Sequence, residues 1–149
     1  MLTIVAGVPA VGKSTACAEL APFEFDDWVR GRYAVEDVEE ATRLFRAEYP
    51  ASNLAYLDAV AEACRRGDAV LVDTFVYRDD RRKALARLRA HGVSPIRLVY
   101  LVASWRTVEA RNRARAKPLS EGTVMNLWFN QEFPSSAEGF DSVEILSNE

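Results

Sequence analysis

The sequence predicts a single α/β domain in which a parallel sheet of about five strands is covered by helices on both faces. Short apolar runs alternate along the chain with longer segments of helical periodicity, and this alternation is typical of parallel sheets with crossover helices. The chain has 149 residues, which suits one domain. Apolar residues make up 49% and charged residues 28% of the chain, as in ordinary globular proteins.

The expected strands are short, mainly apolar runs that are followed by a glycine, an acidic residue or another small residue. Continuous apolar runs of four to seven residues favour parallel strands that are buried on both faces. Three runs are clear and two are weaker, and together they give the expected number of strands. The clear runs cover 2–6, 69–72 and 96–102, and the weaker ones cover 23–25 and 143–146.

The helices are predicted from apolar spacing and from residues that stop a helix. Pro22 and Pro118 interrupt two helical segments, and Gly92 follows a third, as expected at helix ends. Ser120 and Glu121 mark the beginning of the last helix. The expected helices cover residues 13–20, 35–48, 54–66, 79–91, 107–116 and 120–131.

Charge is unevenly distributed along the chain, whose net charge is −3. Residues 24–62 contain ten acids and four arginines, whereas residues 65–117 contain fourteen basic residues and five acids. A basic half can attract phosphate groups, although solvated helix faces are the simpler explanation for any one of these arginines.

The two cysteines and the lack of long apolar segments bear on the compartment. Cys17 and Cys64 have no metal-ligand spacing, and half-buried free thiols fit a reducing cytoplasm. The apolar run at 2–6 lacks a preceding basic residue, so a strand is favoured over a signal peptide. No apolar stretch approaches the roughly 20 residues that span a bilayer, and we expect no membrane segment.

A complete phosphate-binding motif, G-x-x-x-x-G-K-[ST], follows the first expected strand and precedes a helix. Glycines allow the loop to wrap phosphate oxygens with backbone N–H groups, and the following helix directs its positive end at the anion. The expected fold is therefore that of P-loop NTPases and kinases, with ATP as the nucleoside triphosphate, because no guanine-reading motif is found. The predicted nucleotide-binding residues are Gly7, Val8, Pro9, Ala10, Val11, Gly12, Lys13, Ser14 and Thr15.

Within this loop, two side chains have chemical roles. Lys13 is expected to reach the β- and γ-phosphates, and the Ser14 hydroxyl is expected to bind Mg²⁺.

Further functional candidates lie directly after the expected strands, where ligands bind in parallel α/β sheets. Asp27 and Arg30 form D-x-x-R: a carboxylate there can accept a proton from an attacking hydroxyl, and the arginine can hold an anionic acceptor. Asp26 is an alternative base, and acids favoured at a helix N-terminus are an alternative explanation. Asp73 resembles an acid that supports Mg²⁺ directly or through water, with an ordinary strand-end cap as the alternative. Positions after four strands are expected to converge on this edge: Gly7, Asp26-Asp27, Asp73-Thr74 and Ala103-Ser104.

Two arginines, Arg111 and Arg115, are four residues apart and are expected to share one helix face. Such a pair can neutralise charge on a moving phosphoryl group, and a plain basic helix is the alternative. The only histidine, His91, is predicted to be a helix-end residue, which leaves carboxylates as the acid and base groups.

The order P-loop, D-x-x-R, strand-Asp-Thr and R-N-x-x-R before a proline resembles the kinase domain of phage-type polynucleotide 5′-kinases, in the AAA-type P-loop kinase group. The likeness is strongest over residues 70–82, VLVDTFVYRDDRR, and 109–118, EARNRARAKP. The resemblance implies that Asp27 is the general base, that Arg30 and Thr74 contact the acceptor with support from Asp73, and that Arg111 and Arg115 act from a lid around 105–118.

The expected activity is an ATP-dependent kinase, with a polynucleotide 5′-hydroxyl as the leading acceptor. The acidic segment from 36 to 48 departs from the pattern of a surface that binds a long nucleic acid. A small-molecule or hydroxymethyl-base kinase of the same fold is therefore an alternative, and a nucleotide-dependent switch or binding module is another. The acceptor and the oligomeric state are left open by the sequence.

Overall fold

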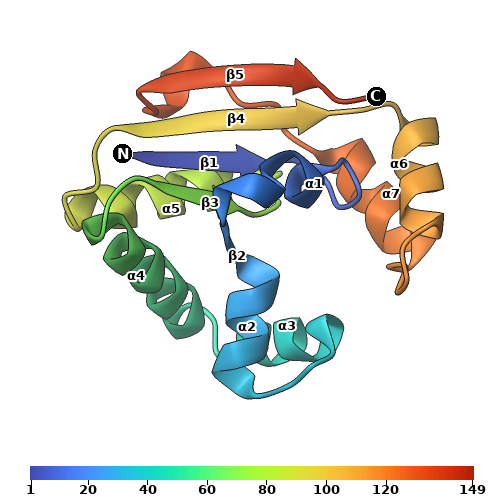
Figure 1. Ribbon diagram of the computed structural model, residues 1–149, viewed down its shortest axis with the longest axis horizontal. Helices are drawn as coiled ribbons and strands as arrows, with labels where there is room; N and C mark the ends of the chain where they lie inside the picture. The colour runs from blue at the N-terminus through green and yellow to red at the C-terminus, as the bar shows by residue number, and fades with distance from the viewer.

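The computed structural model describes residues 1–149, and its centre is a five-stranded parallel sheet. The strand order is β2-β3-β1-β4-β5, and Figure 1 shows β5 at one edge and β2 at the other. This confirms the fold class expected from the alternating pattern. The strands are β1 (Leu2–Ala6), β2 (Phe23–Glu24), β3 (Ala69–Val72), β4 (Ile96–Val102) and β5 (Ser142–Ser147).

Helices cover both faces of the sheet. One core cluster of 20 buried residues lies between the sheet and the helices α2 to α5, and a second cluster of nine lies on the side of α1, α6 and α7. The helices are α1 (Lys13–Cys17), α2 (Phe25–Tyr33), α3 (Val38–Ala47), α4 (Ala51–Arg65), α5 (Arg78–Ala90), α6 (Trp105–Arg113) and α7 (Glu121–Asn130), with short 3₁₀ turns η1 (Ala18–Leu20) and η2 (Ser136–Glu138).

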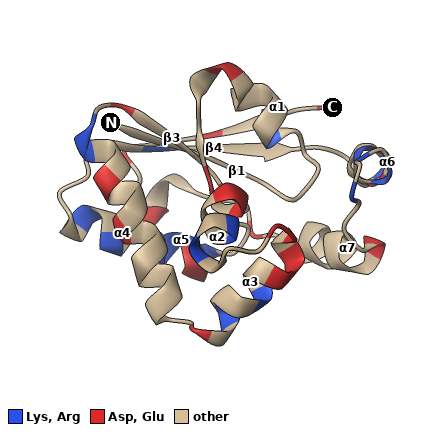
Figure 2. Cartoon of the chain, turned by 60° about the horizontal axis from the view of Figure 1, so that its bottom comes forward, with Lys and Arg blue, Asp and Glu red and all other residues tan.

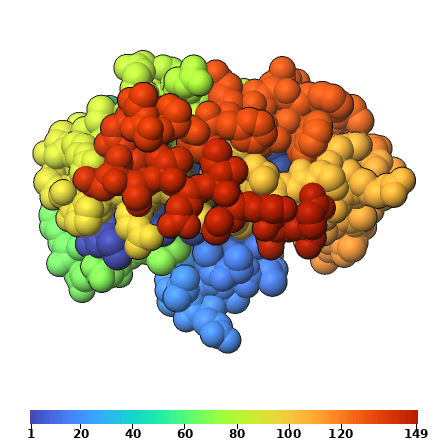
Figure 3. Space-filling model, turned by 90° about the horizontal axis from the view of Figure 1, so that it is seen from above, coloured from blue at the N-terminus to red at the C-terminus, as the bar shows by residue number.

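Alternation along β1 explains why two clusters form. Leu2 and Ile4 belong to the larger cluster, whereas Val5 belongs to the smaller one. Successive side chains of a strand point to opposite faces of the sheet. Figure 3 looks onto the β5 edge, where the C-terminal strand lies at the surface and most of its residues are exposed.

The largest difference from the expected elements lies between 25 and 48. The sequence predicted one helix over 35–48, but α2 occupies Phe25–Tyr33 and α3 begins only at Val38. Ala34 ends α2 in the left-handed conformation with φ 52°, and the Asp37 side chain accepts a hydrogen bond from the Glu39 N–H to cap α3. Two local stop and start signals therefore divide the segment into two helices.

A buried ion pair ties the region after β3 to the chain before β5. The Arg81 guanidinium donates to both carboxylate oxygens of Glu138, at 2.7 and 3.2 Å, and to the Phe75 carbonyl oxygen at 2.8 Å. Phe75 has φ +40°, so Arg81 supports a left-handed turn beside the site. None of the helices combines the length and the apolar character needed to cross a bilayer.

Candidate functional site

The phosphate loop connects β1 to α1 and is fixed by contacts with the neighbouring strand ends. The Gly7 N–H donates to the Thr74 carbonyl oxygen at 2.9 Å. A Cβ atom added at Gly7, which has φ +145°, would lie 2.7 Å from the Leu101 carbonyl oxygen. Glycine is therefore required where the loop passes between the ends of β3 and β4.

Lys13 is folded back over the loop that it follows. Its Nζ donates to the carbonyl oxygens of Gly7 at 2.7 Å and Val8 at 2.8 Å. Burial lowers the pKa of Lys13 to about 8, against the opposing effects of Asp73 and Asp26. An ammonium group held at a phosphate loop is suited to binding phosphate oxygens.

Ser14 begins the helix side of the loop, and its hydroxyl donates to Glu24 Oε1 at 2.6 Å. Because the proton goes to Glu24, the lone pairs of the Ser14 oxygen are available to a cation. No group of three or more His, Cys, Asp or Glu side chains has the arrangement of a metal site. Nucleotide-bound Mg²⁺ takes one or two protein ligands together with phosphates and waters, and a hydroxyl such as that of Ser14 is among the ligands that it takes.

A cavity of about 1040 Å³ opens beside the phosphate loop. It brings together residues from the loop, α2, α3, the end of β3 and the segment around α6, so the predicted convergence holds for the positions after β1, β2 and β3 but not for those after β4. Ala103 and Ser104 do not line it; Ser104 instead caps α6 by accepting from the Thr107 N–H. The predicted site residues that line the cavity are Pro9, Ala10, Gly12, Lys13, Ser14, Thr15, Asp26, Asp73, Thr74, Arg111 and Arg115.

Other predicted loop residues contribute through the backbone. The side chains of Val8 and Val11 are 1% and 0% exposed and belong to the smaller core cluster. They anchor the loop to α6 and α7, and their carbonyl oxygens accept hydrogen bonds, at Val8 from Lys13 and at Val11 from Arg111 and Asn148. Gly7 likewise supplies a carbonyl oxygen to Lys13 and no side chain.

Asp73 sits at the end of β3 with two donors on its carboxylate. The Tyr56 hydroxyl donates to Oδ2 at 2.8 Å, and the Thr74 N–H donates to Oδ1 at 2.6 Å. Burial raises the pKa of Asp73 to about 6, and the two hydrogen bonds oppose that rise. The carboxylate therefore has one fixed orientation at the wall of the cavity.

The first turn of α2 carries two adjacent acids that lie differently. Asp26 lines the cavity beside the loop and also a second cavity of about 1310 Å³, whereas Asp27 lines only the second. Asp27 Oδ1 accepts a hydrogen bond from Arg30 at 2.6 Å, and Arg30 also lines the second cavity. Asp26, and not the D-x-x-R pair, thus reaches the cavity that contains Lys13.

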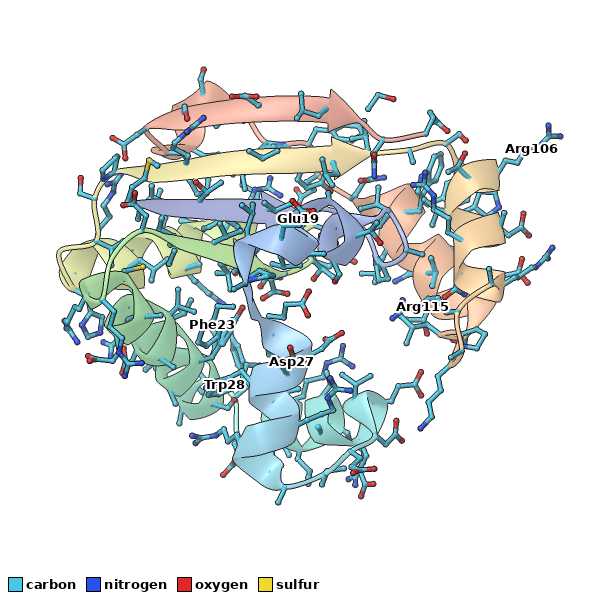
Figure 4. The ribbon with its side chains drawn as sticks, viewed as in Figure 1. Glu19, Phe23, Asp27, Trp28, Arg106 and Arg115 are labelled. Atoms are coloured by element: carbon cyan, nitrogen blue, oxygen red, sulfur yellow. The ribbon has the colours of Figure 1, made fainter.

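The two lid arginines do not share a helix face as predicted, because α6 ends at Arg113. The Asn112 side chain donates to the Leu119 carbonyl oxygen and accepts from the Leu119 N–H, which turns the chain after the helix. Arg115 therefore lies in the turn, and Figure 4 shows it on the opposite side of the site from α2. Arg111 donates to the carbonyl oxygens of Val11 at 3.0 Å and Asn148 at 2.7 Å.

Asn148 and Tyr56 are site residues that the sequence did not reveal. The Asn148 side chain donates to the Val11 carbonyl oxygen at 2.8 Å and lines the cavity. It lies in no motif, and only the parallel pairing of β5 with β4 brings it to the loop. In the sequence, Tyr56 has the position of an ordinary residue on the apolar face of a helix. Only the folded structure shows that its hydroxyl bonds to Asp73.

Comparison with known proteins supports the fold. Residues 2–131 match the model of a family described as AAA domain, and a search of curated proteins finds no match. A sugar kinase from Janibacter sp. HTCC2649 is similar, with a TM-score of 0.66 and 16% identity over 98% of this chain and 84% of that chain. The Deinococcus radiodurans tunicamycin resistance protein has a TM-score of 0.62 and 20% identity over 96% and 84%. Chaetomium thermophilum Kti12 in complex with ADP-AlF3 has a TM-score of 0.62 and 18% identity over 99% and 89%.

Proposed function

Because the chain belongs to the AAA domain family and has the P-loop NTPase/kinase fold, we propose that it is an ATP-dependent phosphotransferase. It moves the γ-phosphate to a hydroxyl group of an acceptor. The observation that carries this proposal is the position of Asp26, which lines both the cavity beside the phosphate loop and the adjoining second cavity. A carboxylate between a donor site and an acceptor site is placed for proton transfer during phosphoryl transfer.

On the donor side, the triphosphate lies in the cavity beside the loop. Backbone N–H groups of the loop, Lys13 and Arg115 hold its oxygens and neutralise the charge that moves with the phosphoryl group. Mg²⁺ bound there supplies further charge neutralisation, and Ser14 and Asp73 are the residues that would hold it, Asp73 directly or through water. Arg111 donates a hydrogen bond to the Val11 carbonyl oxygen, and its charge acts on the phosphates from that position beside the loop.

On the acceptor side, Asp26 accepts the proton of the hydroxyl as its oxygen attacks phosphorus. The oxygen–phosphorus bond to the acceptor forms as the bond between the γ-phosphorus and the bridging oxygen breaks, which leaves ADP. Asp27 and Arg30 form an ion pair beside the second cavity and orient the acceptor, together with Thr74, which lines the cavity beside the phosphate loop. The segment 105–118 serves as a lid, because Arg115 lines both cavities.

The charge of the second cavity supports a small hydroxylated acceptor over a polynucleotide 5′ end. The acids along its wall outnumber the basic residues, and Figure 2 shows acidic residues gathered at the beginnings of α2 and α3. Such a wall repels the phosphates of a polymer. The acids are Glu24, Asp26, Asp27, Glu36, Asp37 and Glu39, and the basic residues are Arg30, Arg115 and Lys117.

Neighbouring variants test the base. Asp26→Asn is expected to lower transfer from γ-labelled ATP by about 10²- to 10⁴-fold while calorimetry shows Mg·ATP binding retained. Asp27→Asn, one residue away, is the matched control and is expected to lose less than about tenfold. The reverse ranking would restore Asp27 as the base, and unchanged nucleotide turnover in both variants would favour a nucleotide-dependent switch.

An acceptor panel tests the substrate class. Purified protein with γ-labelled ATP is offered sugars, nucleosides and 5′-hydroxyl oligonucleotides at about 50 and 200 mM salt. Label on a small acceptor with a shallow salt dependence supports the proposal. Label on oligonucleotides alone, with transfer falling steeply as salt rises, would instead identify a polynucleotide kinase.

A further inference from the structure

Tyr56 connects the two sides of the proposed site, and no motif in the sequence marks it. It lies on α4, is 1% exposed, and donates its hydroxyl hydrogen to Asp73 Oδ2 at 2.8 Å. Asp73 in turn lines the cavity beside the phosphate loop. The hydroxyl of Tyr56 therefore acts on the donor side of the site through Asp73.

The ring of Tyr56 packs against the helix that carries the acceptor-side acids. Its centroid is 5.0 Å from that of Phe25 in an edge-to-face arrangement and 5.2 Å from that of Trp28. Both residues belong to α2, and Phe25 directly precedes Asp26. Figure 4 shows Phe23 and Trp28 in the space between α2 and α4. One side chain thus contacts α2 through its ring and Asp73 through its oxygen.

The Tyr56 hydroxyl is buried, so the hydrogen bond that it makes indicates its role. A phenol oxygen in a core costs free energy unless it is hydrogen-bonded, and a phenylalanine would fill the same space without that requirement. The one hydrogen bond that the Tyr56 hydroxyl makes is directed at a carboxylate of the site. The χ2 angle of an aspartate, which sets the plane of its carboxylate, has a broad distribution. A donor on Oδ2, in addition to the Thr74 N–H on Oδ1, therefore fixes the plane of the Asp73 carboxylate.

We propose that Tyr56 is a positioning residue, which orients Asp73 through its hydroxyl and holds α2 at a fixed spacing from the end of β3 through its ring. This inference rests on the proposed phosphotransferase function. In-line transfer depends on the separation of the acceptor oxygen and the γ-phosphorus, and a displacement of about 1 Å can cost about 10²-fold in rate. The two contacts of Tyr56 set that separation from the protein side.

Three variants separate these contacts. Tyr56→Phe removes only the hydroxyl and is expected to lower kcat about tenfold while the KM values for ATP and acceptor change less than about twofold. Tyr56→Leu also removes the aromatic contacts with α2 and is expected to raise the acceptor KM in addition. Tyr100→Phe is the matched control, because Tyr100 is also buried and donates its hydroxyl to Gln131 at 2.9 Å, outside both cavities.

A double-mutant cycle tests the same hydrogen bond by also changing its acceptor, Asp73. In an Asp73→Asn background, Tyr56→Phe is expected to have much less than its tenfold effect, because coupled residues are not additive. Equal loss of kcat in Tyr56→Phe and Tyr100→Phe, or full additivity with Asp73→Asn, would overturn the inference while leaving the phosphotransferase proposal intact. A wild-type protein that phosphorylates no acceptor would overturn both.

Discussion

At Gly12, the phosphate loop has a backbone conformation that a side chain cannot share. Gly12 has φ +99°, and an added Cβ would lie 2.6 Å from Asn148 Nδ2. We expect Gly12→Ala to lower the free energy of unfolding by about 1–3 kcal/mol and to abolish Mg·ATP binding, because an alanine is strained at this positive φ and its Cβ displaces the Asn148 side chain that bonds to the loop. Urea unfolding and calorimetry measure the two effects.

The control for this change is Gly122→Ala on α7. Gly122 has no atom within 4 Å of an added Cβ and no positive φ, and alanine is favoured over glycine in a helix by about 1 kcal/mol. The control is expected to bind Mg·ATP normally and to be no less stable than the wild type. Similar losses of stability and Mg·ATP binding in both variants would mean that the backbone conformation of Gly12 is not the cause of the effect.

At the scale of single residues, the sequence predicted the functional residues that belong to a continuous motif. The loop and Lys13 follow from nine consecutive residues with a strand before them and a helix after them. Asn148 and Tyr56 were not predicted, because each acquires its role from a partner in another part of the fold: Val11 for Asn148 and Asp73 for Tyr56. The choice between Asp26 and Asp27 depends on the rotation of α2 about its axis, which adjacent residues cannot indicate.

Among the elements, α4 and α5 are joined by a polar contact that titrates. Hydrogen bonds from the Arg87 guanidinium, at 2.8 and 3.0 Å, together with a contact to His91 at 2.6 Å, lower the pKa of Asp58 to about 2. The unfolded chain therefore binds more protons than the folded protein between about pH 4 and pH 2. The stability contributed by this carboxylate is present above that range and is lost as the pH falls through it.

We expect Asp58→Asn to cost about 0.5–1 kcal/mol at pH 7, since the pair is partly exposed. The difference between variant and wild type should shrink as the pH falls from 4 to 2. Urea unfolding at several pH values measures both proteins. A difference that stays constant down to pH 2 would show that the loss comes from packing and not from the charge of Asp58.

The helices and strands were predicted correctly where an apolar pattern extends over many residues. The prediction failed where capping or tertiary contacts set the ends of a helix. The run at 96–102 gave β4 with its exact bounds, and α4, α5 and α7 lie within a few residues of the expected helices. The segment 25–33 was not predicted as a helix, because it follows a two-residue strand and its apolar residues pack against α4 as an aromatic group. The Asn112 contacts with Leu119 that shorten α6 are likewise tertiary.

For the whole molecule, the phosphate loop is attached to the smaller core, so nucleotide binding and folding are linked. Val8 and Val11 are buried in that cluster together with Val108 of α6 and Val124 of α7. A ligand that binds only this folded arrangement stabilises it by about 2.7 kcal/mol at a concentration 100 times its dissociation constant. For a chain of this size, that corresponds to a rise of about 5–10 °C in Tm.

Lys13→Met tests this linkage. The substitution removes the Nζ that bonds to Gly7 and Val8 and that is proposed to bind the phosphates, so we expect the Tm rise with Mg·ATP to disappear. Lys83→Met is the control, because Lys83 lies on α5 and contacts Tyr49 and Asp79 outside the site, and it should keep the full rise. A Lys13→Met protein that is stabilised by Mg·ATP as strongly as the wild type would contradict nucleotide binding at this loop, and the phosphotransferase proposal would then have no donor site.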